Sequence, residues 1–301
     1  MRIVENGEVV RPRVRAIPST SAISEPFGAY LQRKALNWSV LKNMAKSPAH
    51  YAHAVKHGID DTQALKVGRA LHTATLEPEL FATRYAIWDG GTRRGKDWDA
   101  FEARATEEGK ETLKLDEVLE IQVMAQAVRT HPEAAKLLAG GVAEQSLLWS
   151  VESPELGELK ATQRAAKSRI DYRGPLGAVD LKSTRDASPE GFGRQAWTLG
   201  YLGQAAFYVD AIEAATGDVV PYWIVAVEKS APFVVQVYEV SPELLSFGRD
   251  HYRELLVKLA QCEAADRWPG YVDGVAPLTL PRWVLPDEDS GVDSELVFSE
   301  E

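Results

Sequence analysis

The spacing of the apolar residues changes at Gly140 and Gly141, and this change constrains the fold more than any other feature. Before it, apolar residues recur about every three to four positions, as on one face of a helix. After it, short apolar runs are bounded by glycine, proline and serine, which is typical of strands. We therefore expect an α/β protein with a helical N-terminal part.

The second half predicts the element order β-β-β-α-β-β-α. Serine followed by proline and glutamate marks two helix starts, at Ser188 and Ser241. We expect strands over 142–151, 158–172 and 176–183, a helix over 188–216 with a kink near Gly200, a hairpin over 220–240, and a helix ending near Asp266.

The first half predicts helices separated by clear stop signals. Asn37 is a good N-cap, the Ser47–Pro48 pair both ends one helix and starts another, and Gly58 ends the second. Helices are expected over 38–46, 48–57, 63–77, 97–108 and 116–129.

These elements favour one α/β domain with an N-terminal helical elaboration. We place it at 36–284, with a helical part over 36–139 and an α/β core over 140–284, behind an irregular arm over 1–35. Residues 285–301 carry seven acidic residues and no base, so we expect a disordered tail, with a regulatory or partner-binding role as the alternative. Removing its seven charges from the net charge of −10 leaves −3 for the remainder.

The composition limits the cellular compartments and the kinds of metal or disulfide site that we expect. No run of about eighteen apolar residues predicts a membrane span, and the first residues lack the apolar core of a signal peptide. Cys262 is the single cysteine, which excludes an internal disulfide, a four-cysteine zinc site and an iron–sulfur cluster. We expect a cytoplasmic protein.

An acid and a lysine two positions apart, Asp180 and Lys182, lie in the third predicted strand. Side chains alternate along a strand, so these two share a face, and Val179 and Leu181 share the other. A carboxylate that holds Mg²⁺ beside an ammonium group suits metal-dependent phosphodiester hydrolysis. The triplet alone is weak, because such triplets occur by chance and Glu158 with Lys160 is another.

The strand before it strengthens the pattern. Alternation places Lys167, Arg169, Asp171 and Arg173 on one face, with Ser168, Ile170 and Tyr172 on the other. If the two strands are neighbours, Asp171 and Asp180 converge, and facing carboxylates favour a cation between them. On the next helix, Tyr201, Gln204 and Tyr208 follow helical spacing, which by itself is more typical of a core face.

Basic residues cluster between 160 and 173, although the whole chain is acidic. A charge run is usually a solvated face, but beside the expected metal site it favours contact with phosphates without base recognition. The expected DNA-binding residues are Arg164, Lys167, Arg169 and Arg173.

Two other patterns are weaker. Residues 90–96 fit G-x-x-x-x-G-K, but Asp97 stands where a P-loop needs a hydroxyl, so an ATPase is rejected. His53 and His57 are spaced to share a metal, but no third ligand is near in the sequence.

The segments KSRID, VDLKSTRDASPEGF and QAAFYVD, taken in this order, resemble the PD-(D/E)xK nuclease superfamily. More narrowly, the chain resembles the RecE-type (exonuclease VIII) branch, related to RecB-like nuclease domains. LNWSVLKNMAKSPAHY, GRALHTATLEP, RRGKDWDAFEA, DRWPGY and LTLPRW extend the resemblance over roughly 36–284. The resemblance implies a restriction-endonuclease-like core, a mixed β-sheet flanked by helices.

The resemblance also implies an activity, a cofactor and partners. Members of this branch use Mg²⁺, with Mn²⁺ as a substitute, to degrade double-stranded DNA from an end, 5′ to 3′ in the type member. Phage and prophage members act in recombination beside a single-strand annealing protein, and relatives form homo-oligomeric rings around DNA.

Site residues carry over by position. The resemblance implies metal binding by Asp171 and Asp180, with help from the Leu181 carbonyl and from His72. It makes Lys182 the catalytic lysine. Catalytic roles follow for Gln204 and Tyr208, which support the lysine and the DNA backbone, and for Glu144, which stands where relatives often carry an acid.

Two alternatives stay open. One is a nuclease of the same superfamily that is an endonuclease or acts on single strands. The other, from a different class, is a catalytically silent DNA-binding recombination scaffold that keeps the fold.

Overall fold

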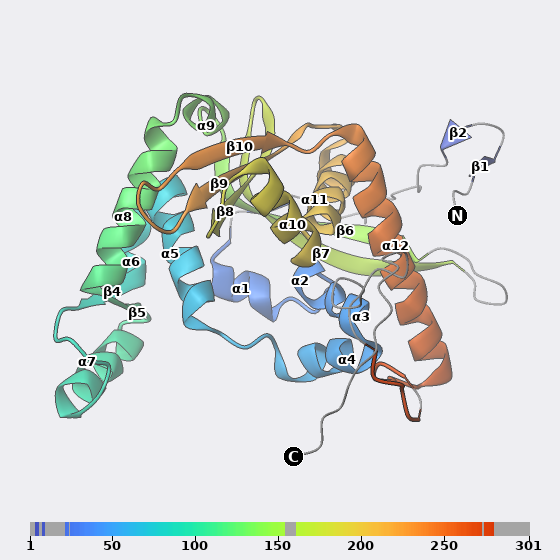
Figure 1. Cartoon of the computed structure of the whole chain (residues 1–301), viewed down its shortest axis with the longest axis horizontal. Helices are drawn as coiled ribbons and strands as arrows, with labels where there is room; N and C mark the ends of the chain where they lie inside the picture. Colours follow the sequence, from blue (N-terminus) through green and yellow to red (C-terminus); the bar gives the residue numbers. More distant parts are fainter. Residues whose placement is uncertain are drawn as a thin grey trace, which may run out of the picture.

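The computed structural model describes residues 4–5, 8–9, 22–23, 25–153, 161–272 and 274–279 (Figure 1). About half of the expected N-terminal arm, residues 154–160, which include Glu158 and Lys160, and the acidic tail over 285–301 lie outside the described residues. Within the arm, β1 (Val4–Glu5) pairs antiparallel with β2 (Glu8–Val9), and α1 spans Phe27–Gln32.

A six-stranded mixed sheet with the order β10-β9-β8-β7-β6-β3 forms the centre of the molecule. Strand β8 pairs parallel with β9, and the other neighbours are antiparallel. The strands are β3 (Ala22–Ile23), β6 (Val142–Ser153), β7 (Thr162–Gly174), β8 (Gly177–Thr184), β9 (Tyr222–Glu228) and β10 (Val235–Glu239). The predicted strand trio and the hairpin are confirmed.

Helices cover both faces of this sheet (Figure 1). The helices that precede β6 in the sequence are α2 (Trp38–Leu41), α3 (Asn43–Lys46), α4 (Pro48–His57), α5 (Gln63–Leu76), α6 (Phe81–Arg84) after a 3-10 turn at Pro78–Leu80, α7 (Lys96–Glu107), α8 (Leu115–Thr130) and α9 (Pro132–Leu137). The helices that follow β8 in the sequence are α10 (Pro189–Thr198), α11 (Tyr201–Thr216) and α12 (Pro242–Ala265). None of the described helices is long and apolar enough to cross a membrane.

Two apolar clusters form the core, one on each face of the sheet. The first joins the sheet to α2, α11 and α12, and the second joins it to α5 and α8. On β8, Ala178 belongs to the first cluster, whereas Val179 and Leu181 belong to the second. The predicted alternation of this strand is therefore confirmed, and Asp180 faces α11.

The predicted helix starts are confirmed by their caps. The side chains of Asn37, Ser47, Ser188 and Ser241 each accept a hydrogen bond from a backbone N–H in the first turn of their helix. One expectation changes in detail: the helix over 188–216 is two helices, because Gly200 adopts a left-handed conformation (φ 75°) between α10 and α11.

The sequence did not predict a second, two-stranded parallel sheet. It consists of β4 (Tyr85–Trp88) and β5 (Glu111–Lys114), with α7 as the connection between them. Each strand has four residues, too few to show a period, and β5 passes directly into α8. The glycine-rich loop over 90–95 joins β4 to α7.

Candidate active site

Strands β7 and β8 separate at the point where Asp171 and Asp180 face each other. Their backbone pairing ends at Tyr172 and Val179, and beyond it the amide of Leu181 donates to Asp171 Oδ2 over 2.9 Å. Ile170 packs into the first cluster and Tyr172 into the second, so the expectation that these two share a face is wrong. The Asp171 carboxylate, and not a backbone carbonyl of β7, accepts from the Leu181 amide. The regular alternation of side chains along β7 is therefore lost at Asp171.

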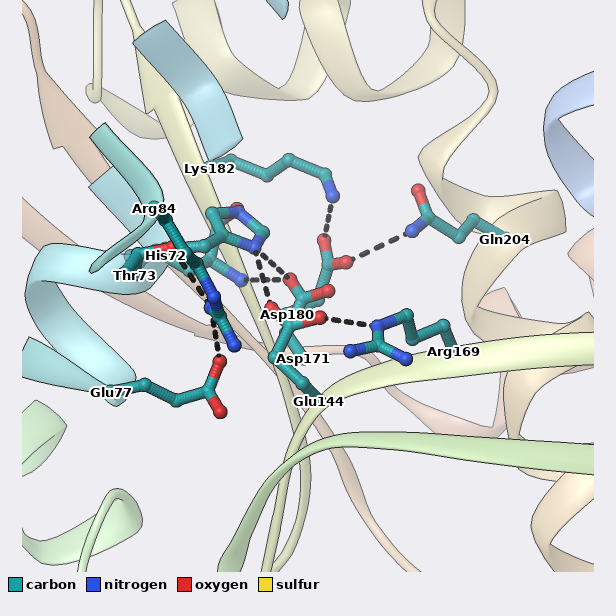
Figure 2. A network of polar contacts seen from close by, with 11 residues as sticks. His72, Thr73, Glu77, Arg84, Glu144, Arg169, Asp171, Asp180, Lys182 and Gln204 are labelled. Atoms are coloured by element: carbon teal, nitrogen blue, oxygen red, sulfur yellow. Dashed lines mark hydrogen bonds and ion pairs between the residues drawn. The ribbon is translucent and has the colours of Figure 1, made fainter. Parts of the chain in front are cut away.

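Three side chains from three elements meet at this separation (Figure 2). His72 of α5, Glu144 of β6 and Asp171 of β7 each offer one ligand atom, and these atoms lie within 4.8 Å of one another. His72 Nδ1 is 3.6 Å from Glu144 Oε1 and 3.7 Å from Asp171 Oδ2. One imidazole and two carboxylates are a donor set that suits a divalent metal ion such as Mn²⁺ or Mg²⁺.

The second ring nitrogen of His72 fixes the ring. Nε2 lies 2.9 Å from the carbonyl oxygen of Leu181, and because a carbonyl only accepts, Nε2 carries the proton. Nδ1 is therefore the atom that faces the carboxylates. A metal-binding histidine usually donates its other N–H to a carbonyl or carboxylate in this way. In this structure the Leu181 carbonyl, expected as a metal ligand, accepts from His72 instead.

Burial and charge shift the pKa values of this group. Burial raises the pKa of the Asp171 carboxyl to about 7, against the lowering effect of His72. Burial lowers the pKa of His72, but Asp171 and Glu144 outweigh it and raise that pKa to about 9. The buried carboxylates of Glu144 and Asp171 therefore stabilise a positive charge on the His72 imidazole. A divalent cation fits the same position once His72 is neutral.

Glu144 is held in place by its backbone and by Arg169. Its φ of 52° is left-handed, which costs a non-glycine residue about 1–2 kcal/mol. Arg169 Nε donates to Glu144 Oε2 over 2.7 Å, and Nη1 donates to Ser146 Oγ and to the Glu25 carbonyl. Burial would raise the pKa of Glu144, but His72 and Arg169 keep it below its usual range. The strained position is one that the surrounding contacts maintain.

Asp180 and Lys182 form a second group beside the first (Figure 2). The buried carboxylate of Asp180 lies 2.5 Å from Lys182 Nζ through Oδ2 and accepts a 2.9 Å hydrogen bond from Gln204 Nε2 through Oδ1. Lys182 Nζ also lies 5.1 Å from the centre of the Tyr201 ring. Asp180 is thus engaged by the lysine and the glutamine, and it is not part of the His72, Glu144 and Asp171 group.

Two tyrosines stand behind Asp180. Tyr208 is half-buried on α11 one turn after Gln204, and burial raises its pKa well above the usual value. Tyr222 begins β9, and its buried hydroxyl has no hydrogen-bond partner among the described residues. Tyr222 could not be predicted from the sequence, because only the parallel pairing of β8 with β9 brings it near Asp180. No local signal marks it.

The four expected DNA-binding residues are all bonded within the protein. Arg164 pairs with Glu263, and Arg173 pairs with Asp218. Lys167 is buried and donates to the carbonyl oxygens of Tyr30, Leu31 and Arg33, and the buried Arg169 pairs with Glu144. In this structure Lys167 and Arg169 are therefore buried, and their charges hold the N-terminal segment and the site together.

His53 and His57 do pack together, with ring centres 4.6 Å apart. Among the described residues, however, the one group of three close metal-binding side chains is that of His72. The structure therefore adds no third ligand to the histidine pair.

Comparisons with known proteins agree with this architecture. A family model described as "PDDEXK-like domain of unknown function (DUF3799)" matches residues 37–279. A crystal structure of a protein from Eubacterium rectale, described as "Putative exonuclease", matches with a TM-score of 0.56 and 14% identity over 90% of this chain and 100% of that chain. This likeness concerns the fold. Together they confirm the expected α/β fold with a mixed sheet and N-terminal helices.

Two further results add nothing to the assignment. The crystal structure of SSO0001 matches with a TM-score of 0.27 and 12% identity over 66% of this chain and 86% of that chain, which carries no argument. No curated protein matches in sequence.

Proposed function

The chain belongs to the PDDEXK-like family DUF3799, and from this membership we propose that it is a metal-dependent deoxyribonuclease that degrades linear double-stranded DNA from an end. The observation that carries the proposal is one arrangement. His72, Glu144 and Asp171 form a ligand set for a divalent ion next to the Asp180–Lys182 pair. A divalent ion and a neighbouring lysine are the groups that metal-dependent phosphodiester hydrolysis uses.

The proposed metal is Mg²⁺, with Mn²⁺ as a substitute. His72, Glu144 and Asp171 would hold it, and Asp180 is close enough for its charge to affect the pKa of Asp171. When bound, the ion supplies Lewis acidity at a phosphate oxygen and lowers the pKa of a bound water. Arg169 keeps the Glu144 carboxylate turned toward His72.

Lys182 would stabilise negative charge on the attacked phosphate. Burial favours its neutral amine, but the carboxylates of Asp180 and Asp171 hold its pKa above the usual value. The side chain is therefore an ammonium ion at neutral pH. A fixed cation in a site of low polarity stabilises the extra charge of the transition state more strongly than one in water.

Gln204 and Tyr201 would position this lysine. Gln204 holds Asp180 from one side, and the face of the Tyr201 ring lies against the ammonium group. Both residues start α11, which Gly200 separates from α10. Because the chain changes direction at Gly200, the first turn of α11 faces β8.

Attack at DNA ends is the finer part of the proposal. It is supported by the likeness to a protein named as an exonuclease, which this chain covers over its whole length, and by the resemblance to the RecE-type branch. We extend it to 5′ to 3′ digestion that leaves single-stranded tails for recombination in a phage or prophage setting. A single-strand annealing partner and a homo-oligomeric ring are part of the same proposal.

The test measures nucleotide release from and binding to three DNAs of the same sequence, in Mg²⁺ and in EDTA. These are linear duplex DNA, covalently closed circular duplex DNA and single-stranded DNA. We expect Mg²⁺-dependent nucleotide release from the linear DNA, an intact circle, and earlier loss of a 5′ label than of a 3′ label. Cutting of the circle would identify an endonuclease. Release from single strands alone would identify a single-strand nuclease. Binding without release at any metal concentration would favour the silent scaffold.

A further inference from the structure

A half-open pocket of about 480 Å³ lies next to the candidate active site, between α2–α3, the α10–α11 junction and α12. This volume is within the roughly 300–1,000 Å³ usual for small-ligand sites. One side of the start of α11 meets the active site through Tyr201 and Gln204, and Gly200, Leu202 and Gly203 line the pocket. The two sites are therefore separated by a single helix turn.

Two aromatic rings in the wall of the pocket are exposed, and a third, Trp38, is buried beside them. Trp197 is 58% exposed and Phe247 is 48% exposed, and their ring centres are 5.5 Å apart. His251 lies one turn after Phe247 on α12, 6.0 Å from Trp197, and Trp38 lies 6.4 Å from His251. Large rings left open beside one another indicate a surface that receives a flat apolar partner.

The charge around these rings is positive. Lys42 and Lys46 are exposed at the rim, and none of the described residues that line the pocket is acidic. This is unusual in a chain with a net charge of −10. Partial burial, and to a lesser degree the nearby Lys182 ammonium group, lower the pKa of Lys42. The cations at this pocket are therefore the two lysines of its rim, Lys42 and Lys46.

We propose that this pocket binds unpaired nucleotides of a single DNA strand, with a base against Trp197 and Phe247 and its phosphates beside Lys42 and Lys46. Aromatic rings flanked by lysines are the usual means of holding single strands without sequence preference. Bases inside a duplex cannot use the rings in this way, because they are already stacked on their neighbours. The proposal rests on the proposed function, since it gives the strand a path beside the site of cleavage.

The test is the binding of a short fluorescein-labelled oligothymidylate, measured by anisotropy in EDTA so that no cleavage occurs. Trp197→Ala is compared with Tyr271→Ala, which removes another exposed ring outside the pocket. We expect the Kd to rise about tenfold for Trp197→Ala, within the range known for base–aromatic stacking, and to stay unchanged for Tyr271→Ala. Binding of a blunt duplex should be equal in both variants.

The lysines give a second, independent measurement. Lys46→Gln should reduce the slope of log Kd against log salt concentration by about 0.7, the value for one phosphate contact on a single strand. Lys56→Gln, an exposed lysine on α4 outside the pocket, should leave the slope unchanged.

Two results would overturn the proposal: oligothymidylate binding that does not depend on Trp197, or an equal loss of single-strand and duplex binding in Trp197→Ala. A failure of the proposed function is distinguishable. If the wild-type protein releases no nucleotides with Mg²⁺ but Trp197→Ala still weakens oligothymidylate binding, the pocket stands and the nuclease does not.

Discussion

His72 connects the two sides of the candidate site through its two ring nitrogens. Nε2 donates to the Leu181 carbonyl on β8, and Nδ1 faces Glu144 and Asp171 on the neighbouring strands. The ring cannot turn without losing one of these contacts. An imidazole held in this orientation is arranged in advance for ligation through Nδ1.

Asp171→Asn tests whether His72, Glu144 and Asp171 bind a metal ion, because it exchanges one carboxylate oxygen for an amide nitrogen. The asparagine oxygen can still accept from the Leu181 amide, so the strands should keep their separation. The lost charge should weaken Mn²⁺ binding by at least about tenfold, since even the loss of an outer-shell partner weakens metal sites by about 10–100-fold. Isothermal titration calorimetry with Mn²⁺ measures this difference.

The matched control is Asp218→Asn, an exposed acid that pairs with Arg173. Its Mn²⁺ affinity should equal that of the wild-type protein. Unchanged affinity in Asp171→Asn would show that the metal binds elsewhere.

At the scale of elements, the start of α11 depends on a close approach to Trp38. A Cβ atom added to Gly203 would lie 2.2 Å from the Trp38 ring, and one added to Gly200 would lie 3.0 Å from it. The absence of both side chains lets the buried Trp38 ring fit under α11. This packing fixes the helix that carries Gln204 toward Asp180.

Gly203→Ala should therefore destabilise the protein, although alanine favours helices. We expect a loss of about 1–3 kcal/mol in the free energy of unfolding from overpacking, measured by urea denaturation. Gly193→Ala on α10 is the control, because nothing lies within 4 Å of an added Cβ there. It should gain up to about 1 kcal/mol from helix propensity. Equal stability of the two variants would mean that Trp38 moves without cost.

The elements that sequence analysis predicted are those with a local signal. The caps at Ser188 and Ser241 and the alternation around Asp180 depend on neighbouring residues, and the structure confirms them. The strand β5 gives no such signal, because four residues show no period and its partner β4 lies beyond α7. Its existence depends on a contact between distant segments.

The candidate site was predictable only in part for the same reason. Asp171 and Asp180 could be expected to meet because their strands are consecutive and antiparallel. The role of Arg169 could not, since its partners Glu144 and the Glu25 carbonyl come from segments about 25 and 144 positions away. A basic residue that is paired in the interior has the same sequence signal as one that faces phosphates.

At the scale of the whole molecule, charge is unevenly distributed along the chain. Seven acidic residues over 285–301 account for most of the net charge of −10. The pocket beside the candidate site instead carries Lys42 and Lys46 and, among the described residues that line it, no acid. Long-range repulsion between an acidic segment and DNA acts over about one Debye length and is screened by salt.

A chain shortened to residues 1–284 should therefore bind duplex DNA more tightly than the full chain at low salt. The advantage should be clear at about 0.01 M ionic strength, where the Debye length is about 30 Å, and should disappear near 1 M, where it is about 3 Å. Fluorescence anisotropy across this range measures it. Weaker binding by the shortened chain at low salt would instead indicate that the acidic segment contributes to DNA binding.

The most direct measurement is nucleotide release from blunt, 5′-phosphorylated linear duplex DNA by the wild-type protein and by Lys182→Ala and Lys182→Gln. Gln keeps a donor for Asp180, so it separates lost chemistry from lost folding. The exposed Lys56→Ala is the control. We predict Mg²⁺-dependent release that stops in EDTA and falls about 10²–10³-fold in both Lys182 variants, whereas DNA binding is unchanged. Full release by either Lys182 variant, or no release by the wild-type protein with any divalent metal, would contradict a nuclease centred on this site.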